Sequence, residues 1–219
     1  MADVSGASGA TRGRIDKRQA ILDAAFRVFA REGFAKACVQ AIATEAGVAK
    51  PTVYNHLTDK ATLFRHAMAA ATEAATAESL AAVERLLDRD PADGGVRAVL
   101  EDVGHRMLVC YCAEDSRAVR RLLYAEVGRF PDLLDIVLGR GPSRVGEILA
   151  DRLARLMLAG RLRTADPAAA GEQFVALLTG PMEARSRFGT RQVPDDELRA
   201  VAAAAAETFL RAYGLAATD

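Results

Sequence analysis

The stretch VQAIATEAGVAKPTVYNHLTDK, residues 39–60, decides the fold of this chain. Gly47 separates two short helical segments, because it adopts the left-handed conformation that closes a helix without steric cost. Pro51 suits the first turn of the second helix, where its missing N–H and fixed φ do no harm. Two helices joined by a turn of three or four residues that contains Gly form a helix-turn-helix, whose second helix enters the major groove of DNA.

The second of these helices carries hydrogen-bonding groups on one face. Val53 and Leu57 lie four residues apart and can face the protein core. The other surface then presents Lys50, Thr52, Asn55 and His56. Polar side chains of these types bind phosphates and contact base edges in the grooves of DNA.

Lys60 begins the next helix, directly after the natural capping pair Thr58 and Asp59. A cation in the first turn opposes the helix dipole, so local stability does not favour it. Free N–H groups together with a Lys form an anion site, and a DNA phosphate is the obvious anion. The alternative is a solvated Lys at a helix start.

These residues resemble the DNA-binding domain of the tetracycline-repressor-like (TetR) family. The match spans roughly fifty positions, far more than one short motif, and comprises Gly33-Phe34, Ile42-Ala43, Ala46-Gly47-Val48, Lys50 to Leu57, Lys60 and Leu63-Phe64. The resemblance implies DNA contacts from Gln40, Lys50, Thr52, Tyr54, Asn55, His56 and Lys60. Of these, Tyr54 and Lys60 are expected to bind mainly phosphates.

The sequence departs from the family pattern at helix caps. Ala37 and Cys38 stand where a Ser or Thr usually opens the second helix, and Ala49 stands where a Ser usually caps the third. Leu57 replaces the usual Phe. Each lost cap weakens its helix by about 1 kcal/mol, but no expected DNA contact is lost.

The composition of the 219-residue chain favours an all-α fold. It is rich in Ala, Leu and Arg, has no Trp and shows no alternating strand pattern. Residues 1–65 carry ten Lys and Arg against six Asp and Glu, and the remainder carries nineteen against twenty-three. A mildly basic N-terminal domain on an acidic body suits a DNA-binding protein.

Apolar spacing and turn residues divide the chain. We expect a disordered arm over residues 1–14, a three-helix DNA-binding domain over 15–60, and a larger helical body for ligand binding and dimerisation over 61–219. Helices are expected over about 16–32, 60–88, 96–113, from 115, from 130 with a break at 139–142 and then to 159, from 167 with a bend at 180–181, and over 194–213.

The last two helices are the expected dimer interface. The run from Ala202 to Ala206 allows close helix approach, and Phe209 and Tyr213 offer anchors. The resemblance implies that these helices pair into a four-helix bundle. The predicted interface residues are Phe174, Leu178, Leu198, Val201, Ala205 and Phe209. The alternative is an Ala-rich helix in a monomeric core.

The region from Arg121 to Gly189 also resembles the AefR-like C-terminal subtype of the family. The resemblance implies that the body binds a small molecule, whose entry releases DNA. Candidate ligand contacts are His105, Met107, Tyr111, Tyr124, Met157, Phe174 and Met182. Each could instead be a core residue, since Met and aromatic stripes usually pack, and His105 is either a ligand contact or a satisfied core His.

No metal site or cofactor is expected. Cys110 and Cys112 point in different directions on a predicted helix, and Cys38 lies far away in sequence. The first fifteen residues lack the apolar core of a signal peptide, and no run of about eighteen apolar residues could span a membrane. We therefore expect a cytoplasmic protein.

The sequence favours a homodimeric repressor that binds an inverted repeat in double-stranded DNA and is released by a small-molecule effector. The alternative is an all-helical small-molecule-binding protein or enzyme with an inherited helix-turn-helix. The sequence offers that alternative few catalytic groups. It has three His, no ligand spacing typical of a metal site, no nucleophile elbow and no phosphate-binding Gly loop. In a third possibility, the helix-turn-helix serves a protein-interaction scaffold.

Overall fold

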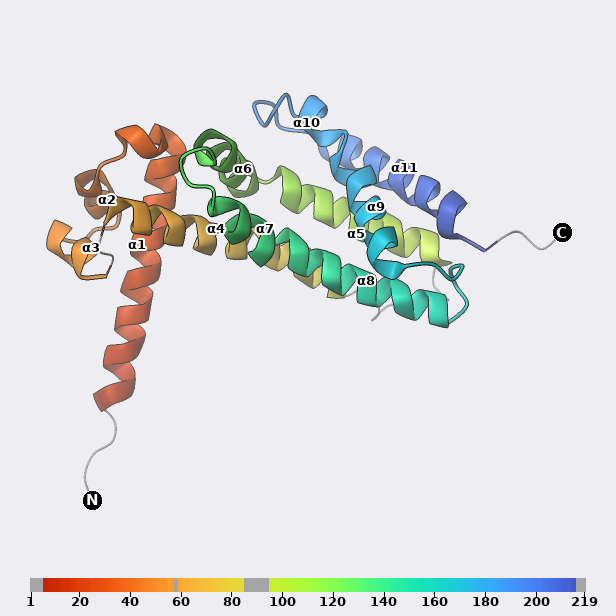
Figure 1. Ribbon diagram of the computed structural model, residues 1–219, viewed down its shortest axis with the longest axis horizontal. Coiled ribbons are helices and arrows are strands. Elements are labelled where there is room, and N and C mark those ends of the chain that lie inside the picture. The colour runs from red at the N-terminus through yellow and green to blue at the C-terminus, as the bar shows by residue number, and fades with distance from the viewer. Residues whose placement is uncertain (1–5, 57–58, 85–94, 216–219) are drawn as a thin grey trace, which may run out of the picture. The chain divides into compact units, whose positions relative to one another are not determined.

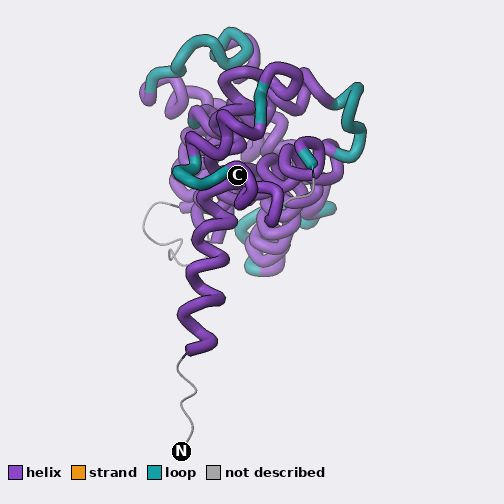
Figure 2. Tube along the Cα trace, turned by 90° about the vertical axis from the view of Figure 1, so that its left-hand side faces the viewer, coloured by secondary structure: helices purple, strands orange, loops and turns teal. Residues whose placement is uncertain are grey.

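The computed structural model describes residues 6–56, 59–84 and 95–215, and these segments form helices joined by short loops, with no strand among them (Figures 1 and 2). The prediction of an all-α fold is confirmed. The chain divides into two compact units. The first unit comprises residues 1–72 and 118–137, and the second comprises residues 73–117 and 138–219.

The first unit contains the predicted helix-turn-helix. Its helices are α1 (Gly6–Lys36), α2 (Val39–Glu45), α3 (Lys50–His56), the first part of α4 (Lys60–Glu84), and most of α6 (Glu114–Glu126) with the start of α7 (Leu133–Arg140). Helix α1 starts at Gly6, so residues 6–14 are helical where we expected a disordered arm. Once a helix is nucleated, each added residue costs little free energy, which allows this N-terminal extension. As predicted, Gly33 interrupts the helix, with φ at 75°.

An aromatic cluster forms the centre of the first unit. Phe29 of α1 packs edge-on against Phe64 of α4, with ring centroids 4.9 Å apart. Phe34 lies 5.1 Å from Phe64 and 4.8 Å from Phe130. Because Phe64 and Phe130 both follow Lys60 in sequence, this unit is larger than the expected domain of residues 15–60.

The second unit contains the rest of the body. Its helices are the second part of α4, α5 (Gly95–Cys112), α8 (Pro142–Leu158), α9 (Pro167–Thr179), α10 (Met182–Arg185) and α11 (Asp195–Tyr213). The predicted break at 139–142 separates α7 from α8, and the predicted bend at 180–181 separates α9 from α10. Helix α4 is described to Glu84, so the expected continuation to residue 88 lies outside the described residues.

Helices α5, α9 and α11 pack closely because Gly104 has no side chain. A Cβ at this position would lie 3.0 Å from Leu178 Cδ2 and 3.4 Å from the Phe174 ring. Phe174 in turn packs edge-on against Phe209 of α11, with centroids 5.2 Å apart. The core of the second unit therefore lies between these helices.

Within the described part of the chain, no helix has the length and apolar character needed to cross a bilayer.

Candidate nucleic-acid interface

The turn between α2 and α3 has the geometry that the sequence predicts. Gly47 has φ at 65°, in the left-handed region. The N–H of Val48 donates to the carbonyl of Ala43 at 3.0 Å, and the N–H of Gly47 donates to the carbonyl of Thr44 at 3.1 Å. These bonds satisfy carbonyls at the end of α2 and fix the direction in which α3 leaves.

Helix α2 has an N-cap that the sequence analysis missed. Cys38 adopts an extended conformation, with φ at −121° and ψ at 149°, and its Sγ accepts a hydrogen bond from the N–H of Ala41 at 3.4 Å. Sulfur is a weak acceptor, so the thiol partly replaces the usual hydroxyl. The extended conformation was not visible in the sequence, which shows only the residue type.

A salt bridge attaches α2 to α1. Arg27 Nε donates to Glu45 Oε1 at 3.0 Å, and Arg31 Nη1 lies 3.6 Å from Glu45 Oε2. Val39, Ile42 and Ala43 are buried on the same side. Helix α2 is therefore held on the aromatic core by both charge and apolar packing, which orients α3.

Helix α3 buries one side and exposes its polar residues. Val53 is 1% exposed, as predicted for the side that faces the core. Lys50, Asn55 and Tyr54 are exposed, Tyr54 with 46% of its surface accessible, and Thr52 is half-buried. Gln40 is exposed on α2. The side chains of His56 and Leu57 lie outside the described residues.

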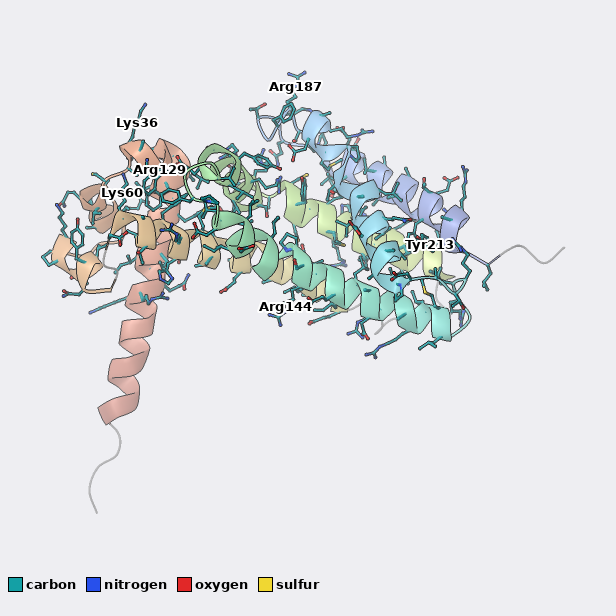
Figure 3. All side chains as sticks on the ribbon, viewed as in Figure 1. Lys36, Lys60, Arg129, Arg144, Arg187 and Tyr213 are labelled. Carbon is teal, nitrogen blue, oxygen red and sulfur yellow. The ribbon has the colours of Figure 1, made fainter. Side chains whose placement is uncertain are left out.

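The start of α4 has the predicted cap. Asp59 Oδ1 accepts from the N–H of Thr62 at 2.8 Å, and Asp59 Oδ2 accepts from the Thr62 hydroxyl at 2.9 Å. Lys60 has an internal contact that the sequence did not predict, since its Nζ donates to the carbonyl of Ala35 at 3.2 Å. The same ammonium group lies 4.7 Å from the centroid of the Phe34 ring (Figure 3). A phosphate would have to compete with this carbonyl, so its binding by Lys60 stays a prediction.

Further cations surround the aromatic cluster. Arg129 lies 4.6 Å from the Phe34 centroid and 5.4 Å from the Phe130 centroid (Figure 3). Arg65 lies 4.9 Å from the Phe130 centroid and donates from Nε to Asp132 Oδ2 at 2.5 Å. This hydrogen bond lowers the pKa of Asp132 and raises that of Arg65. The residues from 129 to 132 thus brace the first turns of α4.

The predicted ligand contacts do not all come together. Met107, Met157, Phe174 and Met182 are buried in the core of the second unit. Tyr111 packs against that core and donates its hydroxyl to Glu183 Oε1 at 2.9 Å.

The other two predicted ligand contacts are not among the buried residues of that core. His105 has a side chain that is 12% exposed, and its Nε2 lies 2.6 Å from Asp195 Oδ1, so it is a satisfied His. The hydrogen bond to His105, followed by that to Arg199, lowers the pKa of Asp195. Tyr124 is 66% exposed and belongs to the first unit, so its role as a ligand contact stays a prediction. Its aromatic character suggested packing, but α6 turns this residue outward.

The predicted dimer-interface residues are buried within a single chain. All six lie in the core of a single chain, each at most 6% exposed: Phe174, Leu178, Leu198, Val201, Ala205 and Phe209. Such small exposed fractions leave little of these side chains for a partner, although Val201, Ala205 and Phe209 line surface grooves. Their place in a dimer interface stays a prediction. Apolar periodicity marks the core-facing side of a helix, which is why the sequence selected them. The same two helices expose a different set, the α9–α11 face: Gln173, Ala176, Ala200, Ala204, Thr208 and Ala212.

Comparison with known sequences places both parts of the chain in one family. Residues 21–67 match the bacterial regulatory proteins of the tetR family. Residues 98–215 match the C-terminal domain of AefR-like transcriptional repressors. No curated protein matches significantly.

Solved structures support the same assignment. A structure described as a TetR-family transcriptional regulator from Mesorhizobium loti MAFF303099 is 28% identical, covers 92% of this chain and 98% of its own, and superposes with a TM-score of 0.84. The flavonoid-responsive regulator FrrA is 27% identical, with coverages of 92% and 99% and a TM-score of 0.70. A TetR transcriptional regulator from Agrobacterium tumefaciens, 22% identical with coverages of 92% and 96% and a TM-score of 0.71, shares the fold. With its helix-turn-helix, its helical body and these matches, the chain belongs to the TetR family of bacterial transcriptional regulators, with an AefR-like C-terminal domain.

Proposed function

We propose that the protein is a homodimeric repressor that binds an inverted repeat in double-stranded DNA and leaves it when a small molecule binds the body. The observation that carries the DNA-binding part is the exposed polar side of α3, whose opposite side is fixed on the core through Val53. A helix held in this way can enter a major groove while its Lys, Tyr and Asn side chains contact phosphates and base edges.

The contacts proposed for DNA come from Gln40, Lys50, Thr52, Tyr54, Asn55, His56 and Lys60. Their local structure supports this assignment for the four described residues that are exposed on α2 and α3. To contact DNA, Lys60 has to exchange its hydrogen bond to the Ala35 carbonyl for one to a phosphate. The negative charge of a phosphate favours this exchange, because charge-assisted hydrogen bonds are stronger than those to a neutral carbonyl.

The proposed dimer forms through the α9–α11 face. One helix-turn-helix contacts only a few base pairs, and two of them in a symmetric dimer match the two halves of an inverted repeat. The face offers small residues that permit close helix approach, and two shallow grooves run along it. In this arrangement the residues after about 60 serve ligand binding and dimerisation.

The proposed effector is a small molecule that enters the second unit. FrrA, one of the similar structures, is named as flavonoid-responsive, which shows that the shared fold can serve a ligand-responsive regulator. Here the candidate contacts are Met107, Tyr111, Met157, Phe174 and Met182. A ligand that prefers the released arrangement by several kcal/mol would empty the operator. We place this activity in the cytoplasm, where bacterial DNA lies.

Selection of bound sequences from random duplex DNA, repeated at two salt concentrations, tests the proposal. We expect an enriched inverted repeat, and binding that weakens with salt at a log–log slope of about −5 to −10, because a dimer neutralises several phosphates. No enrichment at either salt concentration, or binding that does not depend on salt, would contradict it.

A further inference from the structure

The loop of residues 186–191, called the Phe188 loop below, holds its backbone in an unusual conformation. Three consecutive residues have positive φ: Arg187 at 50°, Phe188 at 54° and Gly189 at 81°. Glycine adopts this region freely, but a bulky side chain there is strained. Strain of this kind persists only where the surroundings enforce it, and it is concentrated at functional sites.

Several hydrogen bonds enforce this conformation. The hydroxyl of Ser186, a buried residue, accepts from the N–H of Gly189 at 3.1 Å. The N–H of Phe188 donates to the carbonyl of Glu183 at 2.8 Å. Arg117 Nη1, from the start of α6, donates to the carbonyl of Gly189 at 3.0 Å. The loop is therefore a fixed feature of the second unit.

The fixed loop displays an aromatic ring to solvent. Phe188 has 76% of its surface exposed, and Figure 3 shows its neighbour Arg187 extending outward from the loop. The exposed ring gains little packing within its own chain, so no contact inside the protomer offsets the backbone strain at Phe188. Large aromatic side chains are frequent anchors of protein interfaces, where they fill pockets on the partner.

A groove of suitable size lies next to this loop. It has a volume of about 210 Å³, and its lining residues are Leu177, Pro181, Arg185, Ala200, Val201, Ala204, Ala205 and Thr208. A cavity of about 150 Å³ can hold benzene, so the groove has room for a phenyl ring. Arg185, on the wall of the groove, and Arg191, at the end of the loop, both bond to Glu197 of α11, at 3.0 and 2.9 Å. The loop therefore borders the α9–α11 face.

We propose that Phe188 of each protomer inserts into this groove on a second copy of the chain. The inference rests on the homodimer proposed above and adds its anchor and its receptor site. A two-fold interface is self-complementary, so a protruding ring and a groove that adjoin on one surface are exchanged reciprocally. The partner is a second copy because loop and groove are continuous with the face that the dimer would cover.

A tryptophan in place of Phe188 tests the insertion directly. The chain contains no Trp, so indole fluorescence of the F188W variant reports this position alone. Fluorescence and sedimentation are measured over the same series of protein concentrations. We expect the emission to shift to shorter wavelength as the mass doubles. L158W is the control, because Leu158 is 88% exposed at the end of α8 and outside the face, and its emission should not shift.

The outcomes separate the inference from the dimer on which it rests. A dimer in which the indole of F188W stays exposed to water overturns the insertion and leaves the dimer intact. A wild-type chain that remains monomeric at all concentrations overturns both. If F188W stays monomeric while the wild type dimerises, the larger ring does not fit, which supports the insertion.

Replacing Phe188 by Gly provides a second test. We expect the dimer dissociation constant to rise at least tenfold, because the anchor is lost. Monomer stability should not fall, because Gly relieves the backbone strain at positive φ. An unchanged dissociation constant would contradict the inference, whereas a merely structural role for Phe188 would lower monomer stability.

Discussion

Tyr54 and Asn55 are neighbours on α3, yet their side chains suit different parts of a duplex. A phenol hydroxyl is a good phosphate ligand, and a side-chain amide can pair with the edge of adenine. Both residues are exposed. The helical period predicted this for Asn55, whereas Tyr54 was expected at the DNA only from the family resemblance. The sequence could place Asn55 because exposure in a short helix follows from the position of a buried residue, Val53.

We predict different losses from two single substitutions on this helix. Tyr54→Phe should weaken binding of all DNA sequences alike, since it removes a phosphate contact. Asn55→Ala should cost about 1–3 kcal/mol at particular base pairs and relax the preference there. Binding titrations with the selected repeat and its single-base variants distinguish the two patterns. Identical behaviour of both variants would refute the assigned roles.

Cys38 shows what residue types alone leave undetermined. The sequence indicated a missing cap, whereas the structure shows a thiol in the capping position, bonded to Ala41 N–H. We predict that Cys38→Ser stabilises the protein by up to about 1 kcal/mol, because a hydroxyl accepts this bond better. Urea unfolding of Cys38→Ser and Cys38→Ala measures the difference. A Ser variant no more stable than the Ala variant would show that the cap contributes nothing.

At the scale of elements, the breaks between helices were predictable and their partners were not. Gly141 separates α7 from α8, which begins at Pro142, and Gly180 and Pro181 separate α9 from α10. Local backbone chemistry causes these breaks, so the sequence located them. The packing of Phe130 beside Phe34 joins residues almost a hundred positions apart. Apolar periodicity does not show which distant residues pack together. This explains why the first unit contains more residues than the expected domain.

The ion pair between Arg65 and Asp132 gives this packing a pH dependence. The hydrogen bond from Arg65 lowers the pKa of Asp132 from its ordinary value of 3.8. The contribution of Asp132 to stability is therefore present above that value and is lost as the pH falls below it. Both side chains are more than a third exposed, so water screens the pair and the contribution stays within about 1 kcal/mol.

We predict that Asp132→Asn lowers the free energy of unfolding near neutral pH and that its difference from the wild type shrinks below about pH 4. Urea unfolding at a series of pH values follows this difference. Asp135→Asn, which removes an exposed carboxylate of α7, serves as the control. A gap that stays constant down to pH 3 would exclude the ion pair as its source.

At the scale of the whole molecule, α9 and α11 each have a buried side and an exposed side with different residues. Their apolar sides form the core of the second unit through Phe174 and Phe209. Their outer sides carry small residues and grooves. The sequence selected residues that face the core of these helices, because apolar periodicity marks the packed side and does not identify a surface for a partner.

We predict that a charge on the exposed side of α11 disrupts the dimer, whereas a charge on its buried side disrupts folding. Ala204→Arg places a charge on the exposed face and should give a folded monomer with weak operator binding. Phe209→Asp buries a charge at a position that is 1% exposed and should abolish folding instead. Sedimentation and circular dichroism separate these outcomes, with Ala74→Arg on the exposed side of α4 as a control. A folded, dimeric Ala204→Arg protein would move the interface elsewhere.

The internal contact of Lys60 also bears on selectivity among anions. The carbonyl of Ala35 lies two residues beyond the interruption of α1 at Gly33, and its partial negative charge serves as a built-in counterion for this ammonium group. A dilute anion such as chloride gains little by replacing a counterion that is already in place. A duplex presents phosphates at high local density and can make the exchange. We therefore expect the contact to favour polyanions over free ions at Lys60.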